Sequence, residues 1–339
     1  MAAVGKSTGR RARGRRAAAT AVVAGAVAAG SLTAGCAGGG TPDDGRPPRP
    51  PRTAAWTPAP VPSRPQQARR AAPVLAVKID NARAARPHTG LGAADVVYVE
   101  PVEGGLSRLL AVYASTLPEA VGPVRSARET DLELLRQFDR PALAFSGAQR
   151  RLLPLVGRAP LRAEPPGRRP DAYFRGAGAV PHNLYVRPHR LLRATPGVSA
   201  LTTGFSYGAA PDGGVPEPVR TVRYPAARFT FTWDGSRQRY RVALDGTAAA
   251  TTDGRPVVPS TVVVQNVRIR PSGYADSRGH NTPYTETVGS GTAKVLRGGK
   301  AYDALWKRPE PGDGTRFTTV DGEPLNFATG QVWVVFVRA

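Results

Sequence analysis

The chain has 339 residues and a formal charge of +22, with 47 basic residues, 25 acidic residues and a single cysteine. A lone cysteine excludes an internal disulfide, so a folded part of the chain depends on its hydrophobic core for stability. The basic excess does not indicate nucleic-acid binding, because no recognition helix, zinc finger or aromatic RNA-binding signature accompanies it. Anionic lipid headgroups and cell-wall polymers are the partners that such a charge favours in a cell envelope.

The first 35 residues have the layout of a secretory signal peptide. Five arginines between Arg10 and Arg16 form a positive region, and residues 17–35 are almost all Ala, Val and Gly;. Ala and Gly are weakly apolar, so this segment is a poor permanent membrane span, which needs about 20 strongly apolar residues. The paired arginines are also compatible with twin-arginine export, and the sequence leaves the export route open between Sec and twin-arginine.

Cys36 follows the run Leu32-Thr33-Ala34-Gly35, so small residues precede a cysteine where the signal ends. This arrangement is typical of a bacterial lipobox, although Thr33 stands where the pattern prefers an aliphatic residue. The alternative is an ordinary signal peptide with an incidental cysteine. The sequence predicts lipidation of Cys36, which would hold the protein in membrane lipid at the extracytoplasmic face of the cell membrane.

Composition divides the rest of the chain into four parts. Residues 36–72 are rich in Gly and Pro without apolar periodicity, which predicts a disordered tether;. Residues 73–207 mix strand and helix patterns, residues 208–218 are a Gly/Pro-rich linker, and residues 219–339 contain strand patterns alone;. The predicted fold class is therefore α+β, with a mixed α/β N-terminal domain followed by a mostly antiparallel β C-terminal domain.

In the first domain, short apolar runs rich in β-branched residues predict strands at 74–79, 95–99, 108–114 and 143–145;. A helix is predicted over 127–138, because Ser126 and Glu129 have the spacing of a capping box and Leu132, Leu135 and Phe138 form an apolar stripe;.

In the second domain, segments 228–233 and 239–244 alternate around Asp234-Gly235, which predicts a hairpin;. Further strands are predicted at 262–269, 292–296, 302–306 and 332–337, and together they indicate a small β-sandwich or barrel;. Trp233, Trp306 and Trp333 have strand spacing and are expected in the core.

Several short runs combine charged, polar and glycine residues in a distinctive order. In the first half they are Lys78-Ile79-Asp80-Asn81, Arg86-Pro87, Gly90-Leu91, Ala94-Asp95-Val96-Val97-Tyr98, Val102-Glu103-Gly104-Gly105, Arg108, Gly122-Pro123-Val124-Arg125-Ser126-Ala127-Arg128 and Pro181-His182-Asn183-Leu184-Tyr185. In the second half they are Gln265-Asn266-Val267, Gly289-Ser290-Gly291, Gly299-Lys300 and Leu305-Trp306-Lys307.

These runs resemble the YerB-like family of bacterial envelope lipoproteins, and the resemblance extends over nearly everything from residue 74 onward. It implies a two-domain extracytoplasmic lipoprotein and no settled activity. The segment Phe145-Ser146-Gly147-Ala148 departs from the family pattern, in which a His and a pair of glycines are expected, so no site role is predicted for it.

Charged side chains gather in the sequence where the predicted strands end. Asp80, Glu100 and Glu103 follow apolar runs, and strand ends are where α/β proteins place ligands;. Arg125 and Arg128 flank the predicted helix start, where free amides and arginine forks favour an anion. The sequence predicts a cleft for an anionic wall polymer or peptide; the alternative is that these charges only close loops. The predicted ligand-binding residues are Asp80, Asn81, Arg86, Glu103, Arg108, Arg125, Ser126, Arg128, His182 and Asn183.

A second hypothesis is an envelope hydrolase or transferase that uses Asp80, Glu100 or Glu103 with His182 as acid and base. No cofactor or metal is predicted, because no zinc-type spacing occurs and no pattern supports His88 as a cation ligand. The string Gly204-Phe205-Ser206-Tyr207-Gly208 fits a nucleophile elbow, but a linker follows it where a helix is needed, so it is rejected;.

Overall fold

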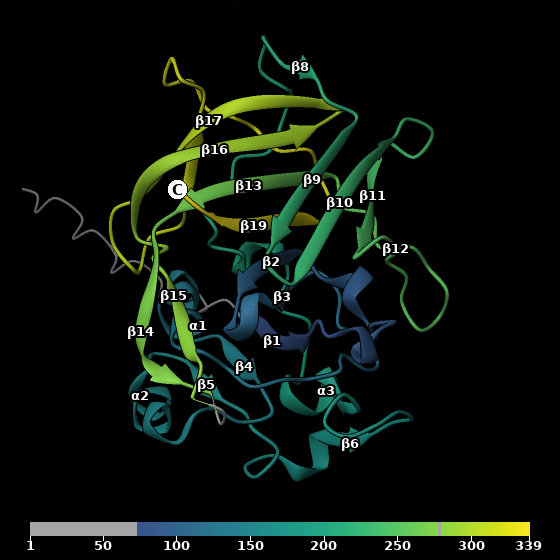
Figure 1. Cartoon of the computed structure of the whole chain (residues 1–339), viewed down its shortest axis with the longest axis vertical. Helices are drawn as coiled ribbons and strands as arrows, with labels where there is room; N and C mark the ends of the chain where they lie inside the picture. The colour runs from purple at the N-terminus through teal and green to yellow at the C-terminus, as the bar shows by residue number, and fades with distance from the viewer. Residues whose placement is uncertain (1–72, 277–278) are drawn as a thin grey trace, which may run out of the picture. The chain divides into compact units, whose positions relative to one another are not determined.

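The computed structural model describes residues 73–276 and 279–339 (Figure 1). The predicted signal peptide, Cys36 and the predicted tether at 36–72 lie outside this range. Most described strands belong to an 11-stranded mixed sheet. Its order is β18 (Arg316–Thr318), β17 (Lys300–Arg308), β16 (Gly289–Arg297), β13 (Thr261–Val267), β19 (Val332–Arg338), β2 (Val96–Pro101), β3 (Ser107–Tyr113), β1 (Leu75–Asp80), β4 (Ala142–Ala144) and β5 (Arg162–Ala163), with β8 (Val215–Pro216) paired to β17.

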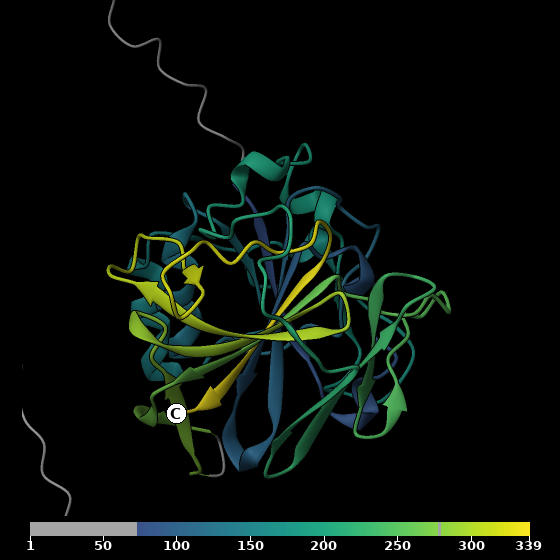
Figure 2. The ribbon, with the colours of Figure 1, turned by 90° about the horizontal axis from the view of Figure 1, so that it is seen from above.

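The last strand joins the two halves of the chain. β19 pairs in parallel with β13 on one side and with β2 on the other, so strands from before and after residues 208–218 form one hydrogen-bonded sheet. Each strand in the series β13, β16, β17 and β18 is antiparallel to its neighbour. A few short helices accompany the strands before residue 208. The α+β class predicted from the sequence is confirmed. Figure 2 shows the twisted fan that the strands of the main sheet form;.

Strands β1, β2 and β3 have both faces buried, which explains why their sequences are almost continuously apolar. On β1, Leu75, Val77 and Ile79 enter one hydrophobic core, and Ala76 enters the other;. The same alternation places the side chains of Lys78 and Asp80 on the face of Ala76, toward the end of the strand;. The strands predicted at 74–79, 95–99 and 108–114 are confirmed, with ends shifted by a residue or two.

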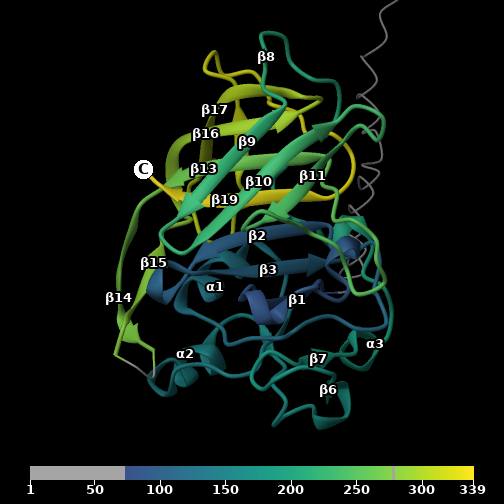
Figure 3. The same ribbon diagram turned by 45° about the vertical axis from the view of Figure 1, so that its right-hand side comes forward.

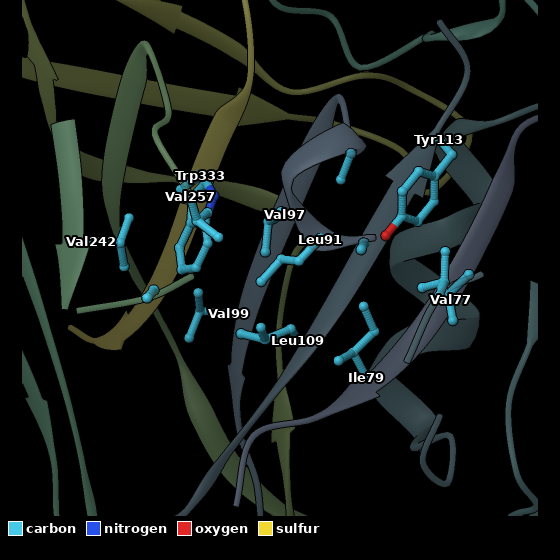
Figure 4. Close-up of a cluster of buried hydrophobic side chains, with 14 of the residues drawn as sticks. Val77, Ile79, Leu91, Val97, Val99, Leu109, Tyr113, Val242, Val257 and Trp333 are labelled. Carbon is cyan, nitrogen blue, oxygen red and sulfur yellow. The ribbon is translucent and has the colours of Figure 1, made fainter. Parts of the chain in front are cut away.

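A four-stranded sheet covers one face of the main sheet (Figure 3). The core between them contains Phe229 and Phe231 from the small sheet and Trp333 from β19, with ring centroids 6.4 and 5.8 Å from the tryptophan. Figure 4 shows Trp333 in this core with Val242 and Val257. The hairpin predicted around Asp234-Gly235 is present, and Trp306 and Trp333 are buried while Trp233 is partly buried. The strands are β9 (Val219–Tyr224), β10 (Ala227–Asp234), β11 (Arg239–Leu244) and β12 (Thr247–Ala248).

Short helices and loops cover part of the opposite face. The helix predicted over 127–138 is shorter: α1 spans Glu129–Leu134, and a 3-10 turn at Leu135–Gln137 follows it. The prediction that Ser126 caps this helix is wrong, because the N-cap is Arg128, whose backbone N–H donates to Asp131 Oδ2 at 2.6 Å;. The remaining elements are α2 (Leu153–Arg158), β6 (Tyr173–Arg175), β7 (Leu184–Val186) and α3 (Pro188–Leu191).

A hairpin from the second half of the chain extends along α1 (Figures 1 and 3). It consists of β14 (Ile269–Ala275) and β15 (Asn281–Thr285), which the sequence did not predict as a hairpin. Tyr284 Oη donates to Glu133 Oε2 at 2.6 Å, and the Thr285 N–H donates to Thr130 Oγ1 at 3.0 Å. The hairpin is thus attached to α1 by polar contacts.

No helix in the described residues has the length and apolar character that a membrane crossing requires.

Candidate functional site

A polar cavity of about 800 Å³ opens where β1, β2 and β3 carry charged residues. Strand register brings these residues together: Arg108 on β3 lies opposite Asp80 of β1 and also opposite Glu100 of β2. The three residues share one face of the sheet, so the cavity forms above the polar end of three otherwise apolar strands. Seven of the predicted site residues line this cavity: Asp80, Glu103, Arg108, Arg125, Ser126, Arg128 and His182.

Asp80 connects two segments of the cavity wall. Its Oδ2 forms an ion pair with Arg125, 3.1 Å from Nε, and accepts from His182 Nδ1 at 2.7 Å, and its Oδ1 accepts from the Ala82 N–H at 3.1 Å. The Asp80 side chain is only 7% exposed, whereas that of Arg125 is 26% exposed. The Arg125 guanidinium therefore lines the cavity while it is paired with the Asp80 carboxylate;.

Glu103 and Arg128 form a bidentate ion pair, in which two guanidinium nitrogens donate to the two carboxylate oxygens. Arg128 Nε donates to Oε1 at 2.7 Å and Nη2 donates to Oε2 at 2.9 Å, and Thr282 of β15 also donates to Oε1. Burial by itself would raise the pKa of Glu103, but the bonds from Arg128 and Thr282 outweigh burial and hold the pKa below its usual value;. Glu103 is thus held as an ionised, fully bonded carboxylate.

Arg108 differs from Arg125 and Arg128. In the described residues its guanidinium makes one hydrogen bond, from Nη1 to the Ser126 carbonyl at 2.9 Å, and no ion pair. Burial, followed by the nearby charges of Arg128 and Arg125, lowers its pKa to about 10, although Glu103 and Asp80 act in the opposite direction;. The cavity therefore contains a guanidinium that lies near Glu103 and Asp80 but forms no ion pair among the described residues.

Three of the predicted residues do not line this cavity. Asn81 accepts from Arg86 and donates to Ser107 Oγ at 2.9 Å, while Arg86 Nη1 bonds Asp245 Oδ2 at 2.9 Å and so ties the loop after β1 to the turn after β11. Asn183 accepts from Arg175 Nη1 at 2.7 Å and donates to the Gly178 carbonyl, which closes the loop between β6 and β7. In these contacts, the side chains of Asn81, Arg86 and Asn183 hold the loops that follow β1 and β6 in place.

His88 and Glu100 are buried beneath or beside the site. His88 Nε2 donates to the Asp80 carbonyl at 2.8 Å, and burial, the largest cause, lowers its pKa to about 4. Glu100 Oε2 and Asp131 Oδ1 each lie 2.7 Å from Lys78 Nζ, and all three side chains are at most 2% exposed. Burial and the charge of Asp131 raise the pKa of Glu100 to about 7.

Five other residues that line the cavity come from segments for which the sequence predicted no site role: Ala148, Gln149, Arg150, Ala275 and Asp276. Ala148 ends the segment where the sequence departs from the family pattern. The last two belong to the β14–β15 hairpin, whose sequence separation from β1 gave no signal of proximity. No helix follows Gly204–Gly208 in the described structure before β8, which agrees with the rejection of this segment as a nucleophile elbow.

The described residues contain no group of three or more His, Cys, Asp or Glu side chains that could hold a metal ion. Arg125 and Arg128 are paired with carboxylates in the cavity, whereas Arg108 and Arg150 have no ion pair among the described residues. Such an arrangement can bind an anionic group through charge-assisted hydrogen bonds.

Two family models together cover most of the described structure. Residues 59–200 match the N-terminal domain, and residues 220–334 the C-terminal domain, of "Protein of unknown function (DUF3048)". The chain belongs to this family, and the resemblance to YerB-like proteins predicted from the sequence is confirmed.

A relative from Bacillus subtilis (strain 168) has the printed name "Putative lipoprotein YerB". It is 28% identical over 284 residues, which cover 78% of this chain and 80% of that protein. The crystal structure of the YerB protein from Bacillus subtilis gives a TM-score of 0.65 at 22% identity, and covers 79% of this chain and 91% of that one. The two proteins share a fold.

Proposed function

We propose that this protein is a lipoprotein anchored through Cys36 at the extracytoplasmic face of the membrane, where its cavity binds an anionic group of a cell-envelope component or peptide. The lipobox-like run before Cys36 and the lipoprotein name of the Bacillus relative support the anchor. A chain tethered in this way meets wall polymers and exported peptides, whose phosphates and carboxylates are its candidate ligands.

The observation that carries the binding proposal is the state of Arg108. Its guanidinium lines an 800 Å³ cavity and has no carboxylate partner in the described part of the chain. Arg125 lies in the same cavity, where its guanidinium forms an ion pair with Asp80. An oxyanion placed between these two residues would supply the missing negative charge and accept several donors at once.

The binding test uses the full-length protein in lipid nanodiscs, titrated with soluble cell-wall fragments and, separately, with inorganic phosphate. Arg108→Gln and Arg125→Gln should each weaken binding about tenfold or more, because a charge-assisted hydrogen bond contributes about 1.5–3 kcal/mol. Arg316→Gln is the matched control, since Arg316 is an exposed arginine on β18, away from the cavity. Equal binding by the wild type and both cavity variants would sink the proposal.

The anchor is tested separately by Cys36→Ser. Wild-type protein should sediment with membranes and the variant should not, because the variant has no thiol to acylate. A variant that still fractionates with membranes would show that Cys36 is not the anchor, and would leave the cavity proposal untouched.

A second candidate function is hydrolysis or group transfer in the same cavity. The specific observation in its favour is the His182–Asp80 hydrogen bond, because a carboxylate that orients an imidazole is a frequent acid–base arrangement;. Glu103 is poorly suited as the acid, since Arg128 and Thr282 occupy both of its oxygens. If the enzyme hypothesis holds, His182→Gln abolishes turnover of wall fragments and leaves their binding intact; equal turnover by His182→Gln and wild type rejects it.

A further inference from the structure

A second cavity, of about 430 Å³, lies on the other side of the turn between β2 and β3. It shares Val102 and Glu103 with the first cavity, so the short 3-10 helix Glu103–Gly105 forms a wall between the two. Its other walls come from the turn after β9, from β14 and β15, and from the end of β19. This volume is within the range of small-molecule sites, which is about 300–1,000 Å³.

The walls of the second cavity are mainly apolar. Four proline rings contribute to them, one each from β2, the β9–β10 turn, β14 and β15, together with the ring of Tyr224. Apolar walls of this kind bind an apolar group by removing it from water, at about 25 cal/mol per Å² of buried surface. The four prolines are Pro101, Pro225, Pro271 and Pro283.

The charges at this cavity are cationic. Arg223 and Arg338 line it, and among the described residues neither guanidinium has a hydrogen bond or ion pair. Arg270 also lines it, but its Nε bonds Glu286 and its guanidinium lies 4.3 Å from the Tyr284 ring centroid. The acidic lining residue is Glu103, and its carboxylate is bonded to Arg128 and Thr282.

The cavity is held in shape by contacts that do not involve a ligand. The Ala226 N–H donates to the Gly105 carbonyl at 2.9 Å, and Tyr224 Oη donates to the Phe336 carbonyl at 2.7 Å. A Cβ atom at Gly105 would lie 2.5 Å from Pro225 Cβ, so the two turns approach too closely for any other residue. A preformed cavity binds with less loss of conformational entropy than one that must be ordered.

We propose that this second cavity is a separate binding site for a small apolar group that carries one carboxylate, such as the C-terminal residue of a peptide with an apolar last side chain. The proline and tyrosine walls would take the apolar group, and Arg223 and Arg338 would take the carboxylate. This proposal does not depend on the function assigned to the first cavity, because the two sites use different arginines.

The test titrates the full-length protein in nanodiscs with three probes: N-acetylphenylalanine, its amide, and acetate. Empty nanodiscs provide the blank. The acid should bind at least tenfold more tightly than either of the other probes, because only the acid has both the ring and the charge. Equal binding of acid and amide would overturn the proposal, since the arginines would then contribute nothing, and so would equal binding of acid and acetate.

Variants then assign the binding to this cavity. Arg223→Gln/Arg338→Gln should reduce the affinity for N-acetylphenylalanine at least tenfold, while Arg316→Gln should leave it unchanged. Arg108→Gln impairs the first cavity, so in this variant the tenfold preference for the acid over the amide and over acetate should persist, which separates this site from the first cavity. Unchanged affinity in the double variant, or loss of that preference in Arg108→Gln, would overturn the assignment to the second cavity.

Discussion

Arg128 and Glu103 are joined by two hydrogen bonds, Nε to Oε1 at 2.7 Å and Nη2 to Oε2 at 2.9 Å, in the wall of the first cavity. Both side chains are nearly buried, with 11% and 7% exposure. This pairing separates the arginines of the cavity into two kinds: Arg128 is neutralised by its partner, and Arg108 is not. Glu103 therefore serves the structure, and Arg108 is the group available to a ligand.

Glu103→Gln is predicted to lower the free energy of unfolding by about 3 kcal/mol, because it leaves the Arg128 cation nearly buried without its carboxylate. Urea unfolding at pH 7 measures this loss. Glu323→Gln is the control, since Glu323 is exposed and its side chain has no bonded partner in the described chain. A loss below about 1 kcal/mol would contradict the assigned role of the pair.

The same variant separates the two functional hypotheses. Folded Glu103→Gln protein should bind inorganic phosphate at least as well as the wild type, because Arg128 becomes available to the anion. A hydrolase that used Glu103 as its acid would lose its turnover in this variant.

Arg108→Met is predicted to raise the melting temperature by a few degrees, since it removes a partly buried cation that forms no ion pair in the described part of the chain;. Added phosphate should raise the melting temperature of the wild type and have no effect on Arg108→Met, because a ligand stabilises only the form that binds it. Differential scanning calorimetry measures both effects, with Arg316→Met as the matched control. A variant that melts several degrees below the wild type would show that Arg108 supports the fold.

The sequence revealed the strands that carry the site because they are buried on both faces. β1 and β2 are mostly apolar and end in charged residues, so Asp80 and Glu103 could be placed at strand ends without a structure;. That strand ends gather at one edge of a sheet is a general rule, and the cavity follows from it.

The parts that the sequence did not reveal depend on contacts between distant polar groups. The β14–β15 hairpin packs on α1 through Thr285–Thr130 and Tyr284–Glu133 hydrogen bonds, and such pairs leave no hydrophobic period in the sequence;. Arg86 resembled a ligand residue because its partner, Asp245, lies 159 positions away. The predicted cap failed for a local reason, since an acceptor stands three residues after Arg128 as well as after Ser126;.

Arg308→Met is predicted to destabilise the protein by about 3 kcal/mol, because it leaves buried carbonyl groups without donors. Arg308 is fully buried and its Nη2 donates to the carbonyls of Glu133 at 3.0 Å and Leu134 at 3.3 Å, at the end of α1. Arg308→Lys should have an intermediate stability, since an ammonium offers fewer donors than a guanidinium. Hydrogen exchange should speed up in residues 129–137 in both variants. Unchanged exchange there would contradict this role.

The difference in unfolding free energy between Glu100→Gln and the wild type is predicted to shift in favour of the variant as the pH rises. Burial and Asp131 raise the folded-state pKa of Glu100 from 4.5 to about 7, and its Oε1 is buried without a hydrogen-bond partner among the described residues. Between these two pH values the folded protein keeps a proton that the unfolded chain has lost, so wild-type stability falls as the pH rises from about 4.5 to about 7;. Glutamine at this position has no proton to lose.

The measurement is the difference in unfolding free energy between Glu100→Gln and wild type, by urea titration from pH 4.5 to pH 8.5. The difference should increase by about 3 kcal/mol up to about pH 7 and stay level above it, since one pKa unit corresponds to about 1.36 kcal/mol;. Lys78 and Asp131, which face Glu100, and His88 are present in both proteins, so most of their own titration cancels. A difference that is the same at pH 5 and pH 8 would show that Glu100 is ionised throughout, with Lys78 balancing both carboxylates.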